Sequence, residues 1–451
     1  MEAFRILGGQ RLDGEVRVDG AKNAALPAMA AALLGDEPLR LTGVPRVTDV
    51  TTLAAVLRHL HVAVRRENDI LQLESDASRG EASQRFLAPQ HLVARMRASF
   101  CVLGPLLALR GRAVVSLPGG CHLGDRPVDL HLRGLAALGA DIRLERGHVV
   151  AESKRLRGAM LSMSGRHGPS VTGTANVLMA ATLARGTTTI ASAAREPEIV
   201  DLGRCLTKMG AKIEGLGTST IEVHGVEQLG GATHQVMPDR IEAATLLAAT
   251  AITQGQVTLR GAPVEALQSV LELLTDAGCQ IDTTPDTIRL RSPERLQPIC
   301  FTARPYPGVP TDVQPLLTAL ATLGGGTSTI EDHVFSARFR HLAELRRLGA
   351  RIELEGPRAK VRGVEQLTGA HVCATDLRAG AALVLAGLAA QGETLVHDVA
   401  PIDRGHERLE AKLSRVGADI ERVPSQRRPT LLRNRQRARE RAAVAARSAP
   451  R

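Results

Sequence analysis

One cysteine lies in a glycine-rich segment where it could do chemistry. Cys121 follows Pro118-Gly119-Gly120, which disfavours helix and strand and lets the backbone come close to a bound group. Arg126 stands five residues later, and its charge would favour the thiolate of Cys121 and would also hold an anion. A cysteine in an ordinary turn gives the same local pattern, so the segment alone leaves a reactive thiol and a turn cysteine both open.

The chain is long enough to supply more than one domain to position such a loop. A chain of 451 residues exceeds the size at which a single hydrophobic core keeps growing, so two domains are expected. A content of 44% hydrophobic and 23% charged residues is typical of a soluble globular protein. Only 2% of the residues are aromatic, so Ala, Leu and Val must fill the interior.

The positive charge is concentrated at the C-terminus. Of the formal net charge of +10, residues 424–451 contribute +8, because nine Arg residues stand against one Glu. This tail has no sustained apolar periodicity and is expected to be solvated and disordered. An arm that binds RNA or acidic lipid is the alternative, and the body of the chain gives no reason to expect a nucleic-acid partner.

No pattern points to secretion, a membrane or a metal. The six cysteines form no CxxC pair and no basic-then-apolar leader opens the chain, so a cytoplasmic location is expected. The longest apolar runs, residues 24–34 and 381–390, are too short to span a bilayer. No Walker loop, HExxH or EF-hand spacing occurs, so we expect no metal and no cofactor.

A helix-end signature recurs about every 70 residues. It is an apolar residue and a glycine before an alternating strand, with a degenerate copy at Leu60-His61-Val62, and it occurs at Leu138-Gly139-Ala140, Met209-Gly210-Ala211, Ala277-Gly278-Cys279, Leu348-Gly349-Ala350 and Val416-Gly417-Ala418. A second signature, an Ala/Leu helix that closes on glycine before a strand, occurs at Gly35, Gly111, Gly186, Gly255, Gly325 and Gly392. The repeats predict an α/β fold of six copies of one unit, which divide into three plus three. A solenoid is the alternative, but solenoid periods of about 20 to 50 residues are shorter.

Eight separate segments carry a further signal, between Phe4 and about Val423. They are Gly20 to Pro27, Met96 to Ser99, the Cys121 loop through His131, Ala194 to Glu198, Pro238 to Glu242, Pro310 to Asp312, Ala374 to Arg378 and Ile402 to Gly405. In this order they resemble the UDP-N-acetylglucosamine enolpyruvyl transferases, which perform the first committed step of peptidoglycan synthesis. The resemblance implies two inside-out α/β barrel domains of three repeats each, facing across a cleft. It also implies their limits: residues 22–237, then residues 1–21 plus 238–423, with 424–451 as a tail.

The resemblance implies a reaction between phosphoenolpyruvate and UDP-N-acetylglucosamine. Addition of the sugar 3-hydroxyl to the vinyl group and elimination of phosphate need cations for two anionic groups, a base and an acid. Cys121 would be the general acid, would form a covalent phospholactoyl adduct and would be alkylated by epoxides such as fosfomycin. Asp312 would be a candidate base for the hydroxyl, although an Asp at this point would also suit a helix N-cap.

The other site residues also follow from the resemblance. Lys22, Arg126 and Arg404 match phosphate and phosphoenolpyruvate ligands, Arg97 matches a basic position, Arg378 would bind the carboxylate, Asn23 would hydrogen-bond the reacting group, and Asp376 would organise the basic ligands. The nucleotide sugar would contact Arg126, Pro127, Val128, Asp129 and Leu130, then Gly168, Pro169, Ser170 and Val171, and also Asp312 and Val334. Solvated surface charges and plain turns are the alternatives for single members of this set.

Three departures from the family pattern affect the nucleotide-sugar side. Thr48 and Gly168 stand where some relatives have Lys, and Ser336-Ala337 replaces a Glu-Asn pair. Besides an RNA-binding protein that acts through the basic tail, two rival functions stay open. A shikimate-type enolpyruvyl transferase would lack the cysteine loop. A catalytically weak paralogue would bind the nucleotide sugar and act as a regulator.

Overall fold

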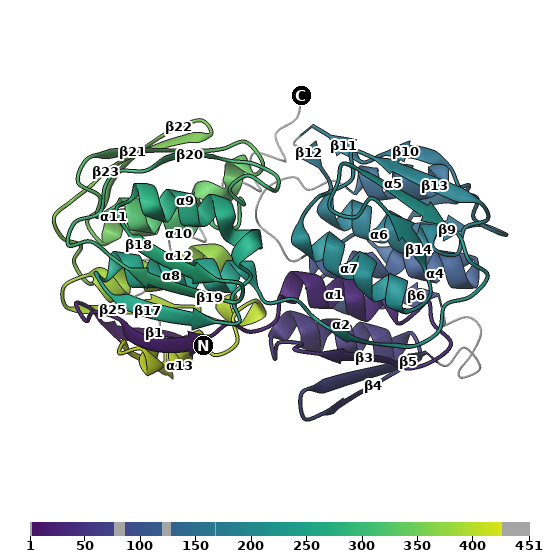
Figure 1. Cartoon of the computed structure of the whole chain (residues 1–451), viewed down its shortest axis with the longest axis horizontal. Coiled ribbons are helices and arrows are strands. Elements are labelled where there is room, and N and C mark those ends of the chain that lie inside the picture. Colours follow the sequence, from purple (N-terminus) through teal and green to yellow (C-terminus); the bar gives the residue numbers. More distant parts are fainter. Residues whose placement is uncertain (1, 76–85, 120–127, 167, 426–451) are drawn as a thin grey trace, which may run out of the picture.

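The computed structural model describes residues 2–75, 86–119, 128–166 and 168–425 (Figure 1). Within these ranges, none of the helices is long and apolar enough to cross a bilayer. The basic tail beyond residue 425 lies outside the described residues.

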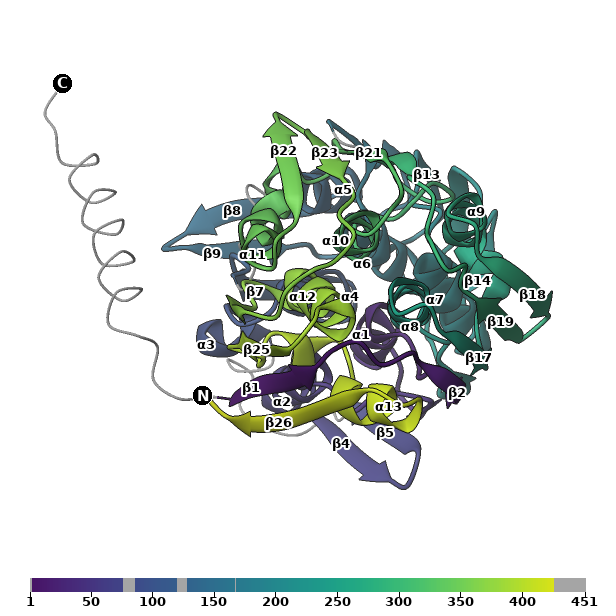
Figure 2. The ribbon, with the colours of Figure 1, turned by 90° about the vertical axis from the view of Figure 1, so that its left-hand side faces the viewer.

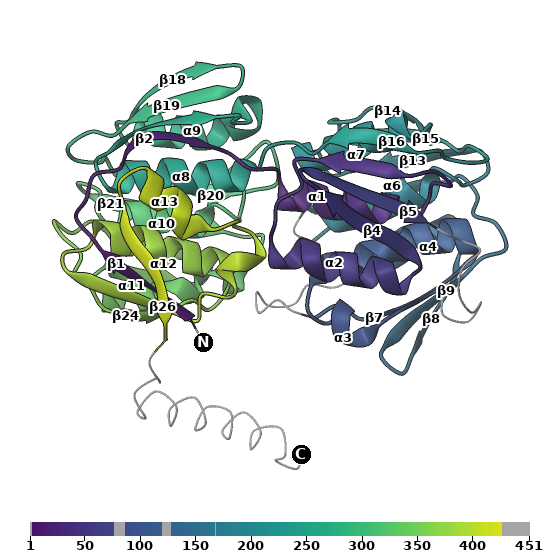
Figure 3. The same cartoon turned by 90° about the horizontal axis from the view of Figure 1, so that it is seen from below.

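Buried side chains form two separate hydrophobic cores. One core runs from Ala21 to Val236, and the other combines Phe4–Val18 with Ile241–Ile420. We call the two bodies the first and the second lobe. The N-terminal strands β1 (Glu2–Leu7) and β2 (Asp13–Arg17) lie on the second lobe, and the chain then crosses to α1 (Lys22–Ala31) in the first, as Figure 3 shows.

Three four-stranded sheets belong to each lobe within the described part of the chain. Each sheet has one parallel pair at an edge followed by two antiparallel pairs. The first-lobe sheets are β16-β3-β5-β4 (Ala232–Gln235, Leu39–Thr42, Ile70–Ser75, Val62–Glu67), β6-β7-β9-β8 (Leu87–Ala88, Arg112–Ser116, His148–Glu152, Asp141–Glu145) and β10-β13-β15-β14 (Met160–Ser162, Thr187–Ala191, Thr220–His224, Lys212–Glu214). The second-lobe sheets are β18-β19-β17-β2 (Gln280–Thr284, Thr287–Arg291 and Gln256–Arg260 with β2), β20-β21-β23-β22 (Cys300–Ala303, Thr327–Asp332, Arg358–Arg362, Arg351–Glu355) and β24-β25-β1-β26 (His371–Cys373 and Glu393–His397 with β1, then Asp419–Pro424). A short ribbon, β11-β12 (Ser164–Gly165, Gly168–Pro169), completes the first lobe.

Ala- and Leu-rich helices occupy the centre of each lobe. All residues of α8 (Arg240–Ile252) and α10 (Gln314–Ala321) are buried, and both pack against α12 (Leu377–Ala389). Figure 2 shows these three helices surrounded by sheets. The first lobe has α1, α4 (Leu103–Arg110) and α6 (Val171–Ala181) in the same role. A helix that is apolar on every side must be buried, so helices inside and sheets outside follow from composition.

The remaining helices bury one face only, as α7 and α9 do. They are α2 (Thr48–His59), α3 (Gln90–Val93), α5 (Asp129–Ala137), α7 (Pro197–Lys208), α9 (Gln268–Asp276), α11 (Leu342–Arg347) and α13 (Leu409–Arg415), with the 3-10 turns η1 (Arg97–Val102), η2 (Val264–Leu267), η3 (Ser336–His341) and η4 (Ile402–Arg404).

The predicted α/β class and the repeated unit are confirmed. In the second unit, α5 ends before Gly139, whose φ of 92° is left-handed, and β8 and β9 follow as the two expected strands. The degenerate first copy has a non-glycine residue at the same point, since His61 takes φ of 63°. Left-handed backbone costs an L-residue about 1–2 kcal/mol, which explains why glycine ends the other helices.

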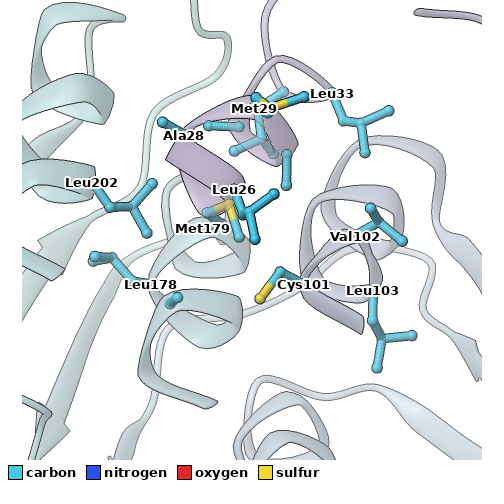
Figure 4. Close-up of a cluster of buried hydrophobic side chains, with 14 of the residues drawn as sticks. Leu26, Ala28, Met29, Leu33, Cys101, Val102, Leu103, Leu178, Met179 and Leu202 are labelled. Atoms are coloured by element: carbon cyan, nitrogen blue, oxygen red, sulfur yellow. The ribbon is translucent and has the colours of Figure 1, made fainter. Parts of the chain in front are cut away.

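The first core is packed mainly with aliphatic and sulfur-containing side chains. Figure 4 shows Leu26 and Met29 of α1 with Cys101 of η1, Met179 of α6 and Leu202 of α7. Each fully buried Leu or Met contributes roughly 1.5–3 kcal/mol. Burial raises the pKa of Cys101 to about 12, so this thiol is a packing residue and not a nucleophile.

The chain crosses between the lobes twice, and the two crossings lie side by side. Gly20 and Pro238 form an antiparallel bridge, and the Ala21 N–H donates to the Met237 carbonyl oxygen at 2.7 Å. A Cβ atom on Gly20 would lie 1.7 Å from the Gly43 carbonyl oxygen, so only glycine fits at this crossing. The paired crossings fix where α1 and α8 begin, and both helices start at residues of the candidate site.

Candidate functional site

Lys22 is the first residue of α1 and is 8% exposed. Its backbone N–H donates to Asp239 Oδ2 at 3.3 Å, and its Nζ donates to Asp49 Oδ2 at 3.1 Å. Asp239 is also the N-cap of α8, where its other oxygen accepts from the N–H groups of Ile241 and Glu242. One carboxylate at the crossing therefore fixes the backbone at the start of both α1 and α8.

Asp49 connects the two lobes. Its Oδ1 accepts a hydrogen bond from Arg404 Nε at 2.9 Å, while Oδ2 accepts from Lys22. Arg404 comes from η4 of the second lobe, whereas Lys22 and Asp49 belong to the first. Asp49 is 3% exposed, so the two cations meet on a buried carboxylate. Sequence reasoning missed Asp49, because an acidic residue in the first turn of a helix is ordinary and gives no signal.

Asp312 is held by two guanidinium groups of the second lobe. Arg338 of η3 donates to Oδ1, and Arg378 of α12 donates to Oδ2 through Nε at 3.2 Å and Nη2 at 3.0 Å. Burial by itself would raise the pKa of Asp312, but the charges and hydrogen bonds of Arg338 and Arg378 outweigh it and hold that pKa well below the ordinary value. Asp312 is therefore ionised, and its affinity for a proton is low in this arrangement.

The N-cap alternative for Asp312 is wrong. Helix α10 begins at Gln314, its N-cap is Val313, and none of the side chains that the structure describes caps it. The Val313 N–H instead bonds to the Pro310 carbonyl oxygen, so a tight turn separates Asp312 from the helix and frees its carboxylate for the arginines.

Asp376 positions Arg378 through the backbone. Its Oδ1 accepts from the N–H groups of Arg378 and Ala379 at 2.9 and 3.0 Å, which makes Asp376 the N-cap of α12. Arg378 is 5% exposed, and within the described part of the chain its Nη1 has no hydrogen-bond partner. A buried guanidinium with one open donor is suited to a second carboxylate.

A second ion pair crosses between the lobes. Arg240 of α8 donates to both carboxylate oxygens of Glu198 of α7, from Nε at 2.9 Å and from Nη2 at 3.1 Å. Beside it, Glu196 Oε1 accepts from the Tyr306 N–H at 3.4 Å, and burial raises the pKa of Glu196. The resemblance marked both segments, but neither carboxylate was assigned a role from the sequence.

The described segments predicted to contact a nucleotide sugar lie together in the first lobe. Val128, Asp129 and Leu130 surround the start of α5, whereas Gly168–Pro169 forms β12. Helices α5 and α6 pack against each other. A Cβ atom on Gly165, the partner of Gly168 in the ribbon, would lie 2.9 Å from Leu130 Cδ1, so the two segments are in close contact.

Ser170 and Val171 continue this segment into α6. Ser170 is the N-cap of α6 and accepts from the Gly173 N–H at 3.1 Å, and Val171 is the first helical residue. Gly168 has φ of 98°, and a Cβ atom there would lie 2.8 Å from Cγ of Pro305 in the second lobe. Glycine at residue 168 thus permits a close approach of the two lobes that lysine would obstruct.

The remaining predicted residues are more scattered. Val334 donates its N–H to Asp332 Oδ1 at 2.9 Å in the turn before η3, Asn23 is exposed at the start of α1, and Arg97 is half-buried at the start of η1. Cys121, Arg126 and Pro127 lie outside the described residues.

Comparison with known proteins identifies the family. The family described as EPSP synthase (3-phosphoshikimate 1-carboxyvinyltransferase) matches residues 6–413. A UDP-N-acetylglucosamine 1-carboxyvinyltransferase of Azorhizobium caulinodans is 51% identical over 436 residues, and one of Halorhodospira halophila is 47% identical over 424 residues. Each alignment covers 94% of this chain and 100% of the relative. The chain belongs to the UDP-N-acetylglucosamine 1-carboxyvinyltransferase family.

Solved structures support the fold of this enolpyruvyl transferase family. The enolpyruvyl transferase NikO from Streptomyces tendae matches with a TM-score of 0.85 at 27% identity, covering 94% of this chain and 99% of NikO. An EPSP synthase from Acinetobacter baumannii matches with a TM-score of 0.71 at 18% identity, covering 94% of this chain and all of that one. The second likeness shows the fold alone. The family predicted from the eight segments is confirmed.

Proposed function

We propose that this enzyme transfers the enolpyruvyl group of phosphoenolpyruvate to the 3-hydroxyl of UDP-N-acetylglucosamine and releases phosphate. The observation that carries the proposal is the meeting of Lys22 and Arg404, from different lobes, on one buried carboxylate. Two cations at a junction of lobes suit a phosphate that bridges them. The full-length relatives bear the name of this activity.

The two anionic groups of the donor would bind at different cations. The phosphate would engage Lys22 and Arg404, and the carboxylate would use the open Nη1 of Arg378. An anion on Arg378 weakens the field that this guanidinium exerts on Asp312, so donor binding would raise the pKa of Asp312 toward its ordinary value. Asp312 would then accept the proton of the sugar hydroxyl more readily than it does in the free enzyme.

The roles in the remaining steps follow from the resemblance, and two of the residues concerned, Cys121 and Arg126, lie outside the described ranges. Cys121 would donate a proton to the vinyl carbon as the hydroxyl oxygen bonds to the adjacent carbon, and Arg126 would add charge at the phosphate. Elimination then breaks the carbon–oxygen bond to phosphate and returns a proton from the former vinyl carbon to the enzyme. Asn23 and Arg97 would contact the reacting groups, and the segments at residues 126–130 and 168–171, with Val334, would hold the nucleotide sugar.

We also propose two domains, residues 22–237 and residues 1–21 with 238–423, on the basis of the two cores. A cytoplasmic location is proposed as well, because Cys101, Cys205 and Cys279 are free thiols that suit a reducing compartment.

An assay with both substrates tests the function. Incubation with phosphoenolpyruvate and UDP-N-acetylglucosamine should release phosphate and yield, by mass spectrometry, one enolpyruvyl ether for each phosphate. Binding of the nucleotide sugar without turnover would favour the regulatory paralogue instead. Cys121→Asp should keep activity and lose inactivation by fosfomycin, because a carboxylic acid can donate a proton but is a poor nucleophile toward epoxides.

A further inference from the structure

A buried asparagine fixes the direction of a chain of hydrogen bonds in the first lobe. Asn176 of α6 is fully buried, and its Oδ1 accepts from the Gly104 N–H at 2.6 Å. A backbone N–H can only donate, so this contact fixes which end of the amide is oxygen. Both hydrogens of Nδ2 are then directed to the Phe100 carbonyl oxygen at 2.9 Å and to His131 Nδ1 at 3.0 Å.

The asparagine determines the tautomer of His131. Because Nδ1 receives a hydrogen, it must be the unprotonated nitrogen, and the proton of the neutral ring is on Nε2. Burial, assisted by the charge of Arg97, lowers the pKa of His131 to about 3, so the ring is neutral at physiological pH. The ring packs edge-on against Phe100, with 5.2 Å between centroids, which restricts its orientation.

Thr172 is the next member of the chain. Its Oγ1 lies 3.1 Å from His131 Nε2 and therefore accepts that proton. The hydroxyl hydrogen of Thr172 must then be donated elsewhere, and no acceptor for it is present in residues 2–75, 86–119, 128–166 or 168–425. Thr172 is half-buried in the first turn of α6, directly after the Gly168–Val171 segment.

We propose that Thr172 donates a hydrogen bond from its hydroxyl to a diphosphate oxygen of the nucleotide sugar, with His131 and Asn176 as positioning residues that direct it. This inference rests on the proposed function. A phosphate oxygen is favoured because it can only accept, and because the N–H groups of Val171 and Thr172 have no partner within the described part of the chain and favour an anion beside them. The relay also joins the two predicted nucleotide-sugar segments, because His131 directly follows residues 128–130.

Affinity measurements on matched variants test the proposal. Thr172→Val keeps the shape of the side chain and removes the donor, so calorimetry should show binding of UDP-N-acetylglucosamine and of UDP weakened by about tenfold to a hundredfold. Thr172→Ser should stay within about threefold of the parent enzyme. Thr182→Val is the control, since the Thr182 hydroxyl donates to the Met179 carbonyl oxygen at the far end of α6, and its affinity should be unchanged.

The outcomes separate this proposal from the proposed function. Unchanged UDP affinity in Thr172→Val, or an equal loss for uridine, which has no phosphate, would overturn the role of Thr172. Failure of the parent enzyme itself to bind the nucleotide sugar would instead overturn the proposed function. In turnover, Thr172→Val should raise KM for UDP-N-acetylglucosamine and leave kcat and KM for phosphoenolpyruvate unchanged.

The positioning role of His131 has a spectroscopic readout that stability does not affect. Nitrogen-15 spectra of histidine-labelled enzyme should show His131 as the neutral Nε2–H tautomer at pH 7, with and without UDP. The signal can be assigned by its loss in His131→Gln. An Nδ1–H tautomer would leave the Thr172 hydroxyl free to donate to the ring, and it would overturn the relay.

Discussion

Two carboxylates in this enzyme each bind two cations, but the two have different roles. Asp49 receives one cation from each lobe, Lys22 and Arg404, and its side chain is 5% exposed. Asp312 receives both cations, Arg338 and Arg378, from the second lobe, and its side chain is 25% exposed. Asp49 therefore joins the lobes and neutralises the cations before substrate arrives. Asp312 is instead an accessible group whose proton affinity is set locally.

The largest expected effect is the loss of Asp312. If it is the base, Asp312→Asn should lower kcat by about 10²- to 10⁴-fold, because an amide cannot accept the hydroxyl proton. Steady-state phosphate release measures the change. The matched control is Asp332→Asn, whose carboxylate accepts from Thr311 Oγ1 and the N–H groups of Val334 and Phe335 and should affect the melting temperature more than kcat. Equal losses of kcat in the two variants would contradict the assignment of Asp312 as the base.

Asp49→Asn should act on stability first. Without the carboxylate, two cations face each other at a buried position, and unfolding free energy should fall by about 3 kcal/mol. Phosphoenolpyruvate should stabilise this variant more than it stabilises the parent, because its phosphate replaces the missing charge. Thermal melts with and without the donor measure both effects.

The exposed carboxylate of Asp36 offers a control, and Asp36→Asn should change stability by less than about 0.5 kcal/mol. An equal donor-induced shift in parent and Asp49→Asn would contradict the assignment of these cations.

The dependence of kcat/KM on pH tests whether Arg338 controls the pKa of Asp312. In the parent enzyme the pKa of Asp312 is well below its ordinary value, so Asp312 should cause no loss of kcat/KM between pH 8 and about pH 5. Arg338→Met removes the larger of the two arginine charge effects that lower the pKa of Asp312, and the effect of burial then raises this pKa. An acid limb should appear, with kcat/KM falling as pH decreases. A profile without that limb would show that Arg338 does not control the carboxylate.

The smallest expected effects are losses of stability at low pH that are caused by buried histidines. The two lobes hold different numbers of these residues. Burial lowers the pKa of His131 in the first lobe to about 3, of His341 in the second to about 4, and of His406 in the second well below its ordinary value. A folded pKa below the unfolded value of about 6.5 means that stability is lost as pH falls from 6.5 toward the folded pKa. Each residue should cost roughly 1 kcal/mol of stability at pH 5.5.

Chemical denaturation at pH 7.5 and pH 5.5 measures this dependence. His406→Phe should reduce this pH dependence by roughly 1 kcal/mol, and the second lobe, which holds two of these three histidines, should lose more stability than the first. An unchanged dependence in His406→Phe would mean that this ring is protonated in the folded enzyme.

The architecture could be predicted from sequence because its determinants are local. Glycines such as Gly139 end helices through a backbone conformation that other residues avoid, and they recur in five of the six units, with His61 at the matching point of the first. The site is non-local. The contact between Lys22 and Arg404 joins residues that are far apart in the chain, so their roles came from resemblance and not from spacing. Asp49 has the pattern of an ordinary acidic residue at a helix start, and the alternative N-cap role of Asp312 is wrong because a tight turn intervenes.

The most direct test of the junction between the lobes is the donor affinity of Arg404→Ala. If Lys22, Asp49 and Arg404 form the phosphate site, this variant should raise KM for phosphoenolpyruvate by at least about tenfold, since a charged hydrogen bond contributes about 1.5–3 kcal/mol. Its calorimetric affinity for UDP-N-acetylglucosamine should stay within about twofold of the parent. A normal KM for the donor, or an equal loss for both substrates, would contradict the account.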